Sequence, residues 1–137
     1  MVWGFFTFFN TGDFVVLPPN LMMNQFNYLE LLCDYLPSSF DDCTAEVFQQ
    51  DGAPCHTAKS VKQWLCDCYV RFIDDWPGNS PDLSPIENLW AIIKRRLQGK
   101  DTSNLKKLES AIRKKWDNLK KKTLLSFSIS LIRCLHA

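Results

Sequence analysis

Two short apolar runs separated by a polar turn open the chain. Residues 3–9 and 13–17 are rich in aromatic and β-branched side chains, and Asn10-Thr11-Gly12 lies between them. Such side chains favour β-strands, and a short polar segment with a glycine favours a tight connection. The pattern predicts an antiparallel hairpin from Trp3–Phe9 to Asp13–Leu17.

Helical spacing follows the hairpin. Apolar residues recur at the i, i+3, i+4 and i+7 positions of one helix face, namely Tyr28, Leu31, Leu32 and Tyr35. Pro37 lacks the N–H that a continuing helix needs, so we expect the first helix to end there.

A strand, a turn and a second helix are predicted next. We expect Glu46–Gln50 to form a strand that stops at Asp51-Gly52-Ala53-Pro54, because glycine and proline forbid its continuation. Asp51 is then an exposed carboxylate at the end of a strand. Thr57 is the expected N-cap of the helix, and Val70–Ile73 is the expected next strand. The buried helix face is predicted to be Val61, Trp64, Leu65 and Cys68.

Two further helices are predicted in the C-terminal half. After an irregular loop over Trp76–Pro85, Ser84 is the expected N-cap, Pro85 the first helical residue and Glu87 the third. The apolar stripe of this helix is Ile86, Leu89, Trp90, Ile93 and Leu97. A final helix is expected to turn inward Leu105, Leu108, Ile112, Trp116 and Leu119.

Charge is divided unevenly along the chain, although the formal net charge is only +1. Residues 1–93 hold three bases and twelve acids, whereas residues 94–137 hold thirteen bases and three acids. The cationic C-terminal segment either binds phosphates without sequence preference or is a solvated helix face that offsets the acidic body.

Six cysteines are more consistent with reduced, partly buried thiols than with a disulfide set, because the apolar start of the chain has no signal-peptide pattern. Cys55-His56 with Cys66 and Cys68 is the cluster that most resembles a zinc site, but its spacing matches no common arrangement. The apolar stretch 124–135 is short of the about 20 residues that span a bilayer. The sequence therefore predicts a soluble protein without a membrane segment.

Asp51 and Glu87 are candidate metal ligands from the pattern alone. A carboxylate at a strand end and another at a helix opening can meet at one edge of a mixed sheet, and hard divalent cations prefer such oxygens. Two carboxylates are few for the two ions that phosphodiester chemistry commonly uses. The structural alternatives are a capping box between Glu87 and Ser84, and a turn-forming Asp51 before Gly52.

Two segments resemble the signature segments of Tc/mariner transposases. They are FQQDGAPCHTA at residues 48–58 and WPGNSPDLSPIENLW at residues 76–90. In that family the first segment contains the second acid of the catalytic triad, and the second segment contains the third. Thirty-five residues separate Asp51 from Glu87, one more than the commonest family spacing. Val2-Trp3-Gly4 and the helix at Tyr28–Leu32 also resemble the family in order and spacing.

The resemblance implies an α/β fold, with an RNase H-like mixed sheet flanked by helices, the first central strand missing and a basic helical tail. Residues 1–100 would form a partial catalytic domain, and residues 101–137 its basic helical extension. Asp51 and Glu87 would be catalytic ligands of Mg²⁺ or Mn²⁺. The implied reaction is strand cleavage by water, followed by attack of a freed 3′-hydroxyl on target DNA. The resemblance also implies a nuclear location and DNA as partner, and it leaves a homodimer open.

Six further residues are candidates for supporting the site or contacting DNA, namely Gln50, His56, Asn88, Lys94, Arg95 and Arg96. Ordinary hydrogen bonding is the alternative for the first three, and a core or capping role is open to the histidine.

No residue of this chain matches the first triad aspartate, which in the family lies on the strand before the hairpin. We expect the chain alone to be marginally stable, because that strand is central, and to be unable to catalyse strand transfer. The alternatives are a non-catalytic DNA-binding or oligomerising remnant and a decayed element copy.

Overall fold

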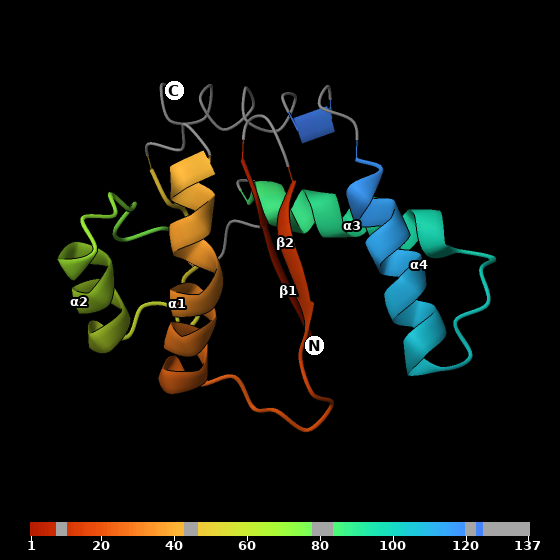
Figure 1. Cartoon of the computed structure of the whole chain (residues 1–137), viewed down its shortest axis with the longest axis horizontal. Coiled ribbons are helices and arrows are strands. Elements are labelled where there is room, and N and C mark those ends of the chain that lie inside the picture. The colour runs from red at the N-terminus through yellow and green to blue at the C-terminus, as the bar shows by residue number, and fades with distance from the viewer. Residues whose placement is uncertain (8–10, 43–46, 78–83, 120–122, 125–137) are drawn as a thin grey trace. The chain divides into compact units, whose positions relative to one another are not determined.

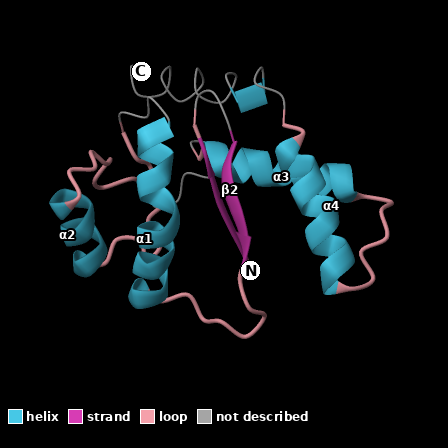
Figure 2. Cartoon of the chain, viewed as in Figure 1, coloured by secondary structure: helices cyan, strands magenta, loops and turns pink. Residues whose placement is uncertain are grey.

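The computed structural model describes residues 1–7, 11–42, 47–77, 84–119 and 123–124. Helices and strands alternate with loops along these residues (Figures 1 and 2). The chain divides into two compact units. We call Met1–Pro19 with Pro81–Ala137 the hairpin unit, and Asn20–Ser80 the α1–α2 unit.

The hairpin unit begins with the predicted antiparallel pair. Strand β1 (Val2–Phe6) pairs with β2 (Thr11–Val16), with Trp3 opposite Val15 and Phe6 opposite Thr11. The hairpin is confirmed, but Thr11 and Gly12 belong to β2 and not to the turn, and the register of the pair shifts between Gly4 and Phe6. The end of the predicted first strand, at residues 8–10, lies outside the described residues.

Gly12 is required by close packing within the hairpin. A Cβ atom at this position would lie 2.0 Å from ring carbons of Phe5. The Gly12 carbonyl also accepts a hydrogen bond from Trp116 Nε1 at 2.9 Å. A glycine in this strand therefore leaves room for an aromatic ring, as strand glycines often do where another group approaches closely.

Two helices pack on each other and on the hairpin. Helices α3 (Pro85–Leu97) and α4 (Leu105–Asp117) enclose a buried core with β2. Its fully or nearly fully buried members are Phe14, Leu89, Ile93, Trp116 and Leu124. The predicted stripes lie in or against this core except at Leu108, which is only half-buried, and at Leu105, which is 55% exposed because it opens α4.

The core of the hairpin unit is aromatic at its centre. Trp90 stacks on Trp116 with ring centroids 5.1 Å apart, and Phe14 lies 5.8 Å from Trp116. Each of these rings removes a large apolar area from water. Because α3 supplies Trp90, this packing fixes the helix on which Glu87 lies.

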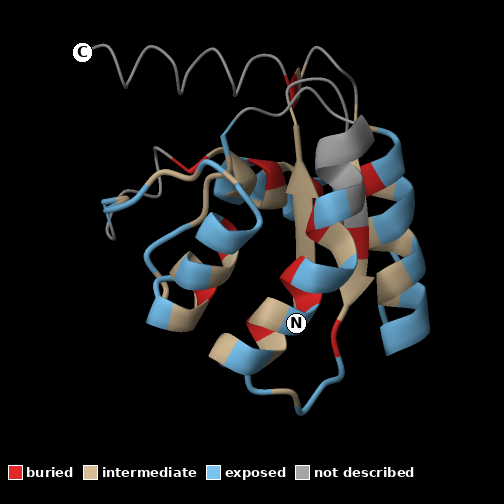
Figure 3. Cartoon of the chain, turned by 60° about the vertical axis from the view of Figure 1, so that its left-hand side comes forward, coloured by how far each residue is buried: buried red, intermediate tan, exposed pale blue. Residues whose placement is uncertain are grey.

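The α1–α2 unit contains a longer helix than the sequence predicts. Helix α1 (Gln25–Asp42) continues through Pro37, so the predicted end is wrong. A proline inside a helix removes one N–H from the hydrogen-bond ladder but leaves the later ones in place. Tyr28, Leu31, Leu32 and Leu36 are buried, whereas Tyr35 is only half-buried. Buried and exposed residues alternate around the helices, as Figure 3 shows.

Helix α2 (Lys59–Asp67) begins two residues after the expected cap. Ala58 is its N-cap, and Thr57 instead donates from Oγ1 to the Ala53 carbonyl at 3.2 Å. The hydroxyl is engaged by the preceding turn, so the predicted capping role is wrong. Val61 and Leu65 are buried as predicted, but Cys68 is exposed because it follows the last helical residue.

The two short strands predicted in this unit meet at a single parallel bridge, within the part of the chain that the structure describes. Phe48 pairs with Phe72, and two hydrogen bonds flank the bridge, from Phe48 N to Arg71 O and from Ile73 N to Phe48 O. Residues 43–46 lie outside the described residues. Asp51 follows the bridge by three residues, as a carboxylate just beyond a strand end.

Candidate active site

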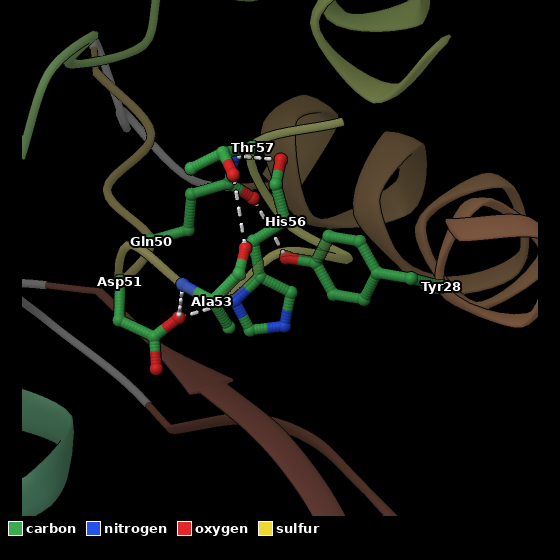
Figure 4. A network of polar contacts seen from close by, with 6 residues as sticks. All are labelled: Tyr28, Gln50, Asp51, Ala53, His56 and Thr57. Carbon is green, nitrogen blue, oxygen red and sulfur yellow. Dashed lines mark hydrogen bonds and ion pairs between the residues drawn. The ribbon is translucent and has the colours of Figure 1, made fainter. Parts of the chain in front are cut away.

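The carboxylate of Asp51 is held at one oxygen and open at the other. Oδ1 lies 2.5 Å from His56 Nδ1 and accepts the N–H of Ala53 at 3.0 Å (Figure 4). Oδ2 has no hydrogen-bond partner among the described residues. The Asp51 side chain is 47% exposed. The turn at Gly52-Ala53-Pro54 therefore orients an acid toward solvent.

His56 is fixed by contacts at its ring and at its backbone. Its ring lies between Asp51 and Tyr28, with 4.1 Å between the His56 and Tyr28 ring centroids (Figure 4). Its N–H donates to the Ala53 carbonyl, and its own carbonyl accepts Gln50 Nε2, both at 2.9 Å. Facing a carboxylate, Nδ1 must carry the proton of this hydrogen bond. His56 is thus a partner of Asp51 and not a core histidine.

Tyr28 and Gln50 complete the network behind the loop. The Tyr28 hydroxyl donates to Gln50 Oε1 at 2.9 Å. Burial, and then the nearby charge of Asp51, raises the pKa of this hydroxyl well above its ordinary value, so it stays a donor. The sequence indicates Gln50 as a candidate but Tyr28 only as a residue of a buried helix face. No local sequence signal indicates a contact between residues 22 positions apart.

Glu87 lies in the first turn of α3 and is exposed. Ser84 is the N-cap and Pro85 the first helical residue, as predicted, but the Ser84 side chain makes no capping hydrogen bond. A capping box needs a hydrogen bond to the Ser84 side chain as well as one to the Glu87 side chain, and the one to Ser84 is absent. The described residues include no hydrogen-bond or ion-pair partner for the Glu87 carboxylate.

The remaining candidates also lie on α3. Asn88 is exposed, and its side chain is 3.5 Å from the Ser84 carbonyl, a long contact within one helical turn. Lys94, Arg95 and Arg96 are exposed in the last turn. Positive side chains at a helix C-terminus interact favourably with the helix dipole.

Asp51 lies in the α1–α2 unit, and Glu87 lies in the hairpin unit. The structure brings Asp51 together with His56, Gln50 and Tyr28, and it places Glu87 beside Asn88 on one helix turn. Among the described residues, no three His, Cys, Asp or Glu side chains are grouped as for a metal ion. The zinc cluster considered at Cys55-His56, Cys66 and Cys68 is therefore not assembled.

Four cysteines are described, and all are free thiols. Burial raises the pKa of the Cys55 thiol, which is the one that is partly buried. Cys33, Cys66 and Cys68 are exposed, so the prediction of partial burial is wrong for them. Cys43 and Cys134 lie outside the described residues.

Comparison with known proteins gives these residues a family context. Residues 14–109 match the family model described as DDE superfamily endonuclease. This range contains both candidate carboxylates and covers more than half of the chain. The chain belongs to the DDE superfamily endonuclease family.

Transposases of nematodes are among its relatives. The chain is 37% identical over 106 residues to the Tcb2 transposase of Caenorhabditis briggsae, and 38% identical over the same length to the Tc1 transposase of Caenorhabditis elegans. Each alignment covers 76% of this chain and 38% of the relative. The chain thus corresponds to well under half of the curated relatives that it matches.

Solved structures establish the fold. The chain matches the catalytic domain of Mos1 mariner transposase with a TM-score of 0.82 and 17% identity, over 95% of this chain and 67% of that one. The Mos1 strand transfer complex matches with a TM-score of 0.83 and 17% identity, over 95% of this chain and 38% of that one. The predicted RNase H-like α/β fold is confirmed.

In the part of the chain that the structure describes, no helix is long and apolar enough to cross a membrane.

Proposed function

We propose that Asp51 and Glu87 are two carboxylate ligands of a divalent-metal site that cleaves and joins DNA strands in a Tc1/mariner-type transposase. One observation carries the proposal. The Asp51 carboxylate is held by its own loop through one oxygen and is open at the other. This carboxylate lies within the stretch that the chain shares with DDE superfamily endonucleases.

The donor set fits Mg²⁺ or Mn²⁺. Both ions take hard oxygen ligands, and Mg²⁺ is often held by one or two carboxylates together with substrate phosphates. When bound, the ions would neutralise charge that develops on the scissile phosphate and activate the attacking oxygen. His56 and the Ala53 amide would keep Asp51 oriented, as outer partners of metal-binding carboxylates do. Gln50 supports His56, and Asn88 lies beside Glu87.

Related solved proteins support the choice of metal and partner. Mos1 catalytic-domain structures are described with Mn and with Mg, and a Mos1 paired-end complex is described with the left transposon end. On that basis we propose that this chain also binds a divalent metal and transposon DNA, and that it is located in the nucleus. Residues 1–100 would be the catalytic part, and residues 101–137 a basic helical extension.

Mn²⁺ titration calorimetry on the 137-residue chain tests the proposal. Asp51→Asn and Glu87→Gln should each lower Mn²⁺ affinity by about tenfold or more, because each removes one ligand charge. Asp67→Asn and Glu109→Gln are matched controls, since both residues are acids bonded to neighbours on their own helices, and their affinities should equal that of the parent chain. Equal affinity for the parent and Asp51→Asn would contradict the proposal.

Cleavage requires more than these two ligands. Two carboxylates are too few to hold two ions securely, so we propose that a third comes from outside these 137 residues. The chain alone should bind Mn²⁺ without nicking DNA. If the purified chain nicks DNA and Asp51→Ala abolishes this activity, the residues of this chain suffice for cleavage.

A second function, sequence-independent DNA binding, is favoured by the basic residues of the hairpin unit. Lys107 is paired with Asp101, and Arg113 with Glu109. Other exposed bases have no ion-pair partner in the described part of the chain, namely Lys94, Arg95, Arg96, Lys100, Lys106 and Lys114. Binding through them would release counterions and weaken steeply with salt.

Gel shifts at several salt concentrations test this function. Replacing Lys94, Arg95 and Arg96 by glutamine should weaken binding. It should also reduce the slope of log affinity against log salt concentration by about one for each phosphate that the variant no longer neutralises. Lys59→Gln, in the α1–α2 unit, should leave both the affinity and the slope unchanged. A shift that is insensitive to salt, with self-association of the chain, would indicate an oligomerising module instead.

A further inference from the structure

Tyr28 contacts the chain on both sides of Asp51. Its hydroxyl donates to Gln50, the residue before Asp51, and its ring packs on His56, whose Nδ1 lies 2.5 Å from the Asp51 carboxylate. Tyr28 is only 2% exposed and is anchored on α1. One buried side chain therefore links a helix to the residue before the carboxylate and to the residue that holds it.

The contacts form a closed path. The Tyr28 hydroxyl fixes which end of the Gln50 amide is the oxygen, because only Oε1 can accept its proton. Gln50 Nε2 then points to the His56 carbonyl. With the backbone held there and the ring packed on Tyr28, His56 Nδ1 faces Asp51 Oδ1 (Figure 4). Removing the hydroxyl frees the Gln50 amide and loosens the hydrogen bonds that follow it along the path.

We propose that Tyr28 is a positioning residue for Asp51. Acting through Gln50 and His56, it holds Oδ1 toward the loop and leaves Oδ2 open to solvent. Its consequence for metal binding rests on the proposed function, but the orientation of the carboxylate does not.

The Tyr28→Phe chain tests the orientation without metal. This substitution keeps the ring that packs on His56 and removes only the hydroxyl. In ¹⁵N NMR spectra of the full chain, the Ala53 amide, which donates to Asp51, and the His56 ring nitrogens should shift toward their values in Asp51→Ala. Tyr69→Phe is the matched control, because Tyr69 lies in the same unit and is 94% exposed, and it should shift neither. Unchanged signals in Tyr28→Phe would overturn the proposal.

Mn²⁺ titration separates this proposal from the function on which it rests. Tyr28→Phe should lower Mn²⁺ affinity about tenfold, the loss typical of outer-shell substitutions, and Asp51→Ala should lower it further. If Asp51→Ala binds Mn²⁺ like the parent chain, the proposed function fails, and the metal-free signals still decide the role of Tyr28. If Asp51→Ala loses Mn²⁺ but Tyr28→Phe does not, the positioning role is overturned alone.

Gln50→Met tests the route of the effect. It removes both hydrogen bonds of the amide while keeping an unbranched side chain of similar size. The double variant Tyr28→Phe/Gln50→Met should bind Mn²⁺ no more weakly than Gln50→Met alone, because both changes break one path. Two additive losses of affinity would overturn a path through Gln50.

Discussion

The two candidate carboxylates are held in different ways. Asp51 depends on a polar loop in which His56 and a backbone amide bond one of its oxygens, and Tyr28 and Gln50 hold that loop from behind. Glu87 has no partner among the described residues and depends on the packing of α3 against an aromatic core. Hydrogen bonds therefore orient one acid, whereas apolar burial fixes only the helix that carries the other. The orientation of Asp51 should therefore be sensitive to substitution of single polar residues, and the position of Glu87 to substitutions in the core.

The largest effect is expected at the core under Glu87. Trp116 is 1% exposed, stacks on Trp90 and donates to the Gly12 carbonyl. Trp116→Ala should lower the free energy of unfolding by about 3–5 kcal/mol, the usual cost of truncating a buried aromatic residue. Urea denaturation measures this loss. Leu105→Ala, at an exposed position of the same helix, is the control and should cost far less. Equal losses would contradict a core centred on Trp116.

A smaller loss is expected from crowding the hairpin. Gly12→Ala places a methyl group where the Phe5 ring lies, so it should cost about 1–3 kcal/mol, as overpacking does. Thermal unfolding of the single variant and of the double variant Gly12→Ala/Phe5→Leu measures it. The double variant should be less destabilised than the sum of the two single variants, because a smaller side chain relieves the clash. Simple additivity would show that Phe5 is not the obstacle.

A gain is expected at the C-terminus of α2. Tyr69 has a φ of 57° and follows the C-cap residue, Cys68, and the N–H groups of Tyr69 and Val70 bond back to Cys66 and Leu65. This left-handed position costs a non-glycine residue roughly 1 kcal/mol. Tyr69→Gly should raise the midpoint of thermal unfolding, and Tyr69→Ala should not. A lower midpoint for the glycine variant would mean that Tyr69 makes stabilising contacts.

The smallest effect on the free energy of unfolding is expected at the carboxylates themselves, in the absence of metal. Asp51→Ala removes two hydrogen bonds at a half-exposed site and should cost about 0.5–1 kcal/mol. Glu87→Ala removes no partner and should stay within about 0.5 kcal/mol of the parent chain. Chemical denaturation of both variants measures the difference. A larger loss at Glu87 than at Asp51 would reverse the comparison.

Local signals in the sequence predicted what local structure determines. Pro85 marked the start of α3 correctly, because the fixed φ of proline acts within one turn, and Ser84 is the N-cap although its side chain makes no capping hydrogen bond. Three other predictions from local signals failed. α1 passes Pro37, the Thr57 hydroxyl bonds Ala53 instead of capping α2, and Gly12 lies under a ring instead of in a turn.

The candidate site was predicted in part. The positions of Asp51 beyond a strand end and Glu87 at a helix opening followed from glycine, proline and apolar spacing. The network behind Asp51 did not, because the hydroxyl of Tyr28 meets Gln50 only after α1 packs in place. A tyrosine at a buried helical position looks like a core residue whichever way its hydroxyl points.

The central proposal, that Asp51 and Glu87 are ligands of one divalent-metal site, is tested most directly by paramagnetic broadening with Mn²⁺. Amide signals of residues 51–53 and 86–88 should broaden together, with one midpoint, and Asp51→Asn or Glu87→Gln should each move both midpoints to an Mn²⁺ concentration about tenfold higher or more. Broadening at residues 51–53 that keeps its midpoint in Glu87→Gln, or signals at residues 86–88 that Mn²⁺ never affects, would contradict the proposal.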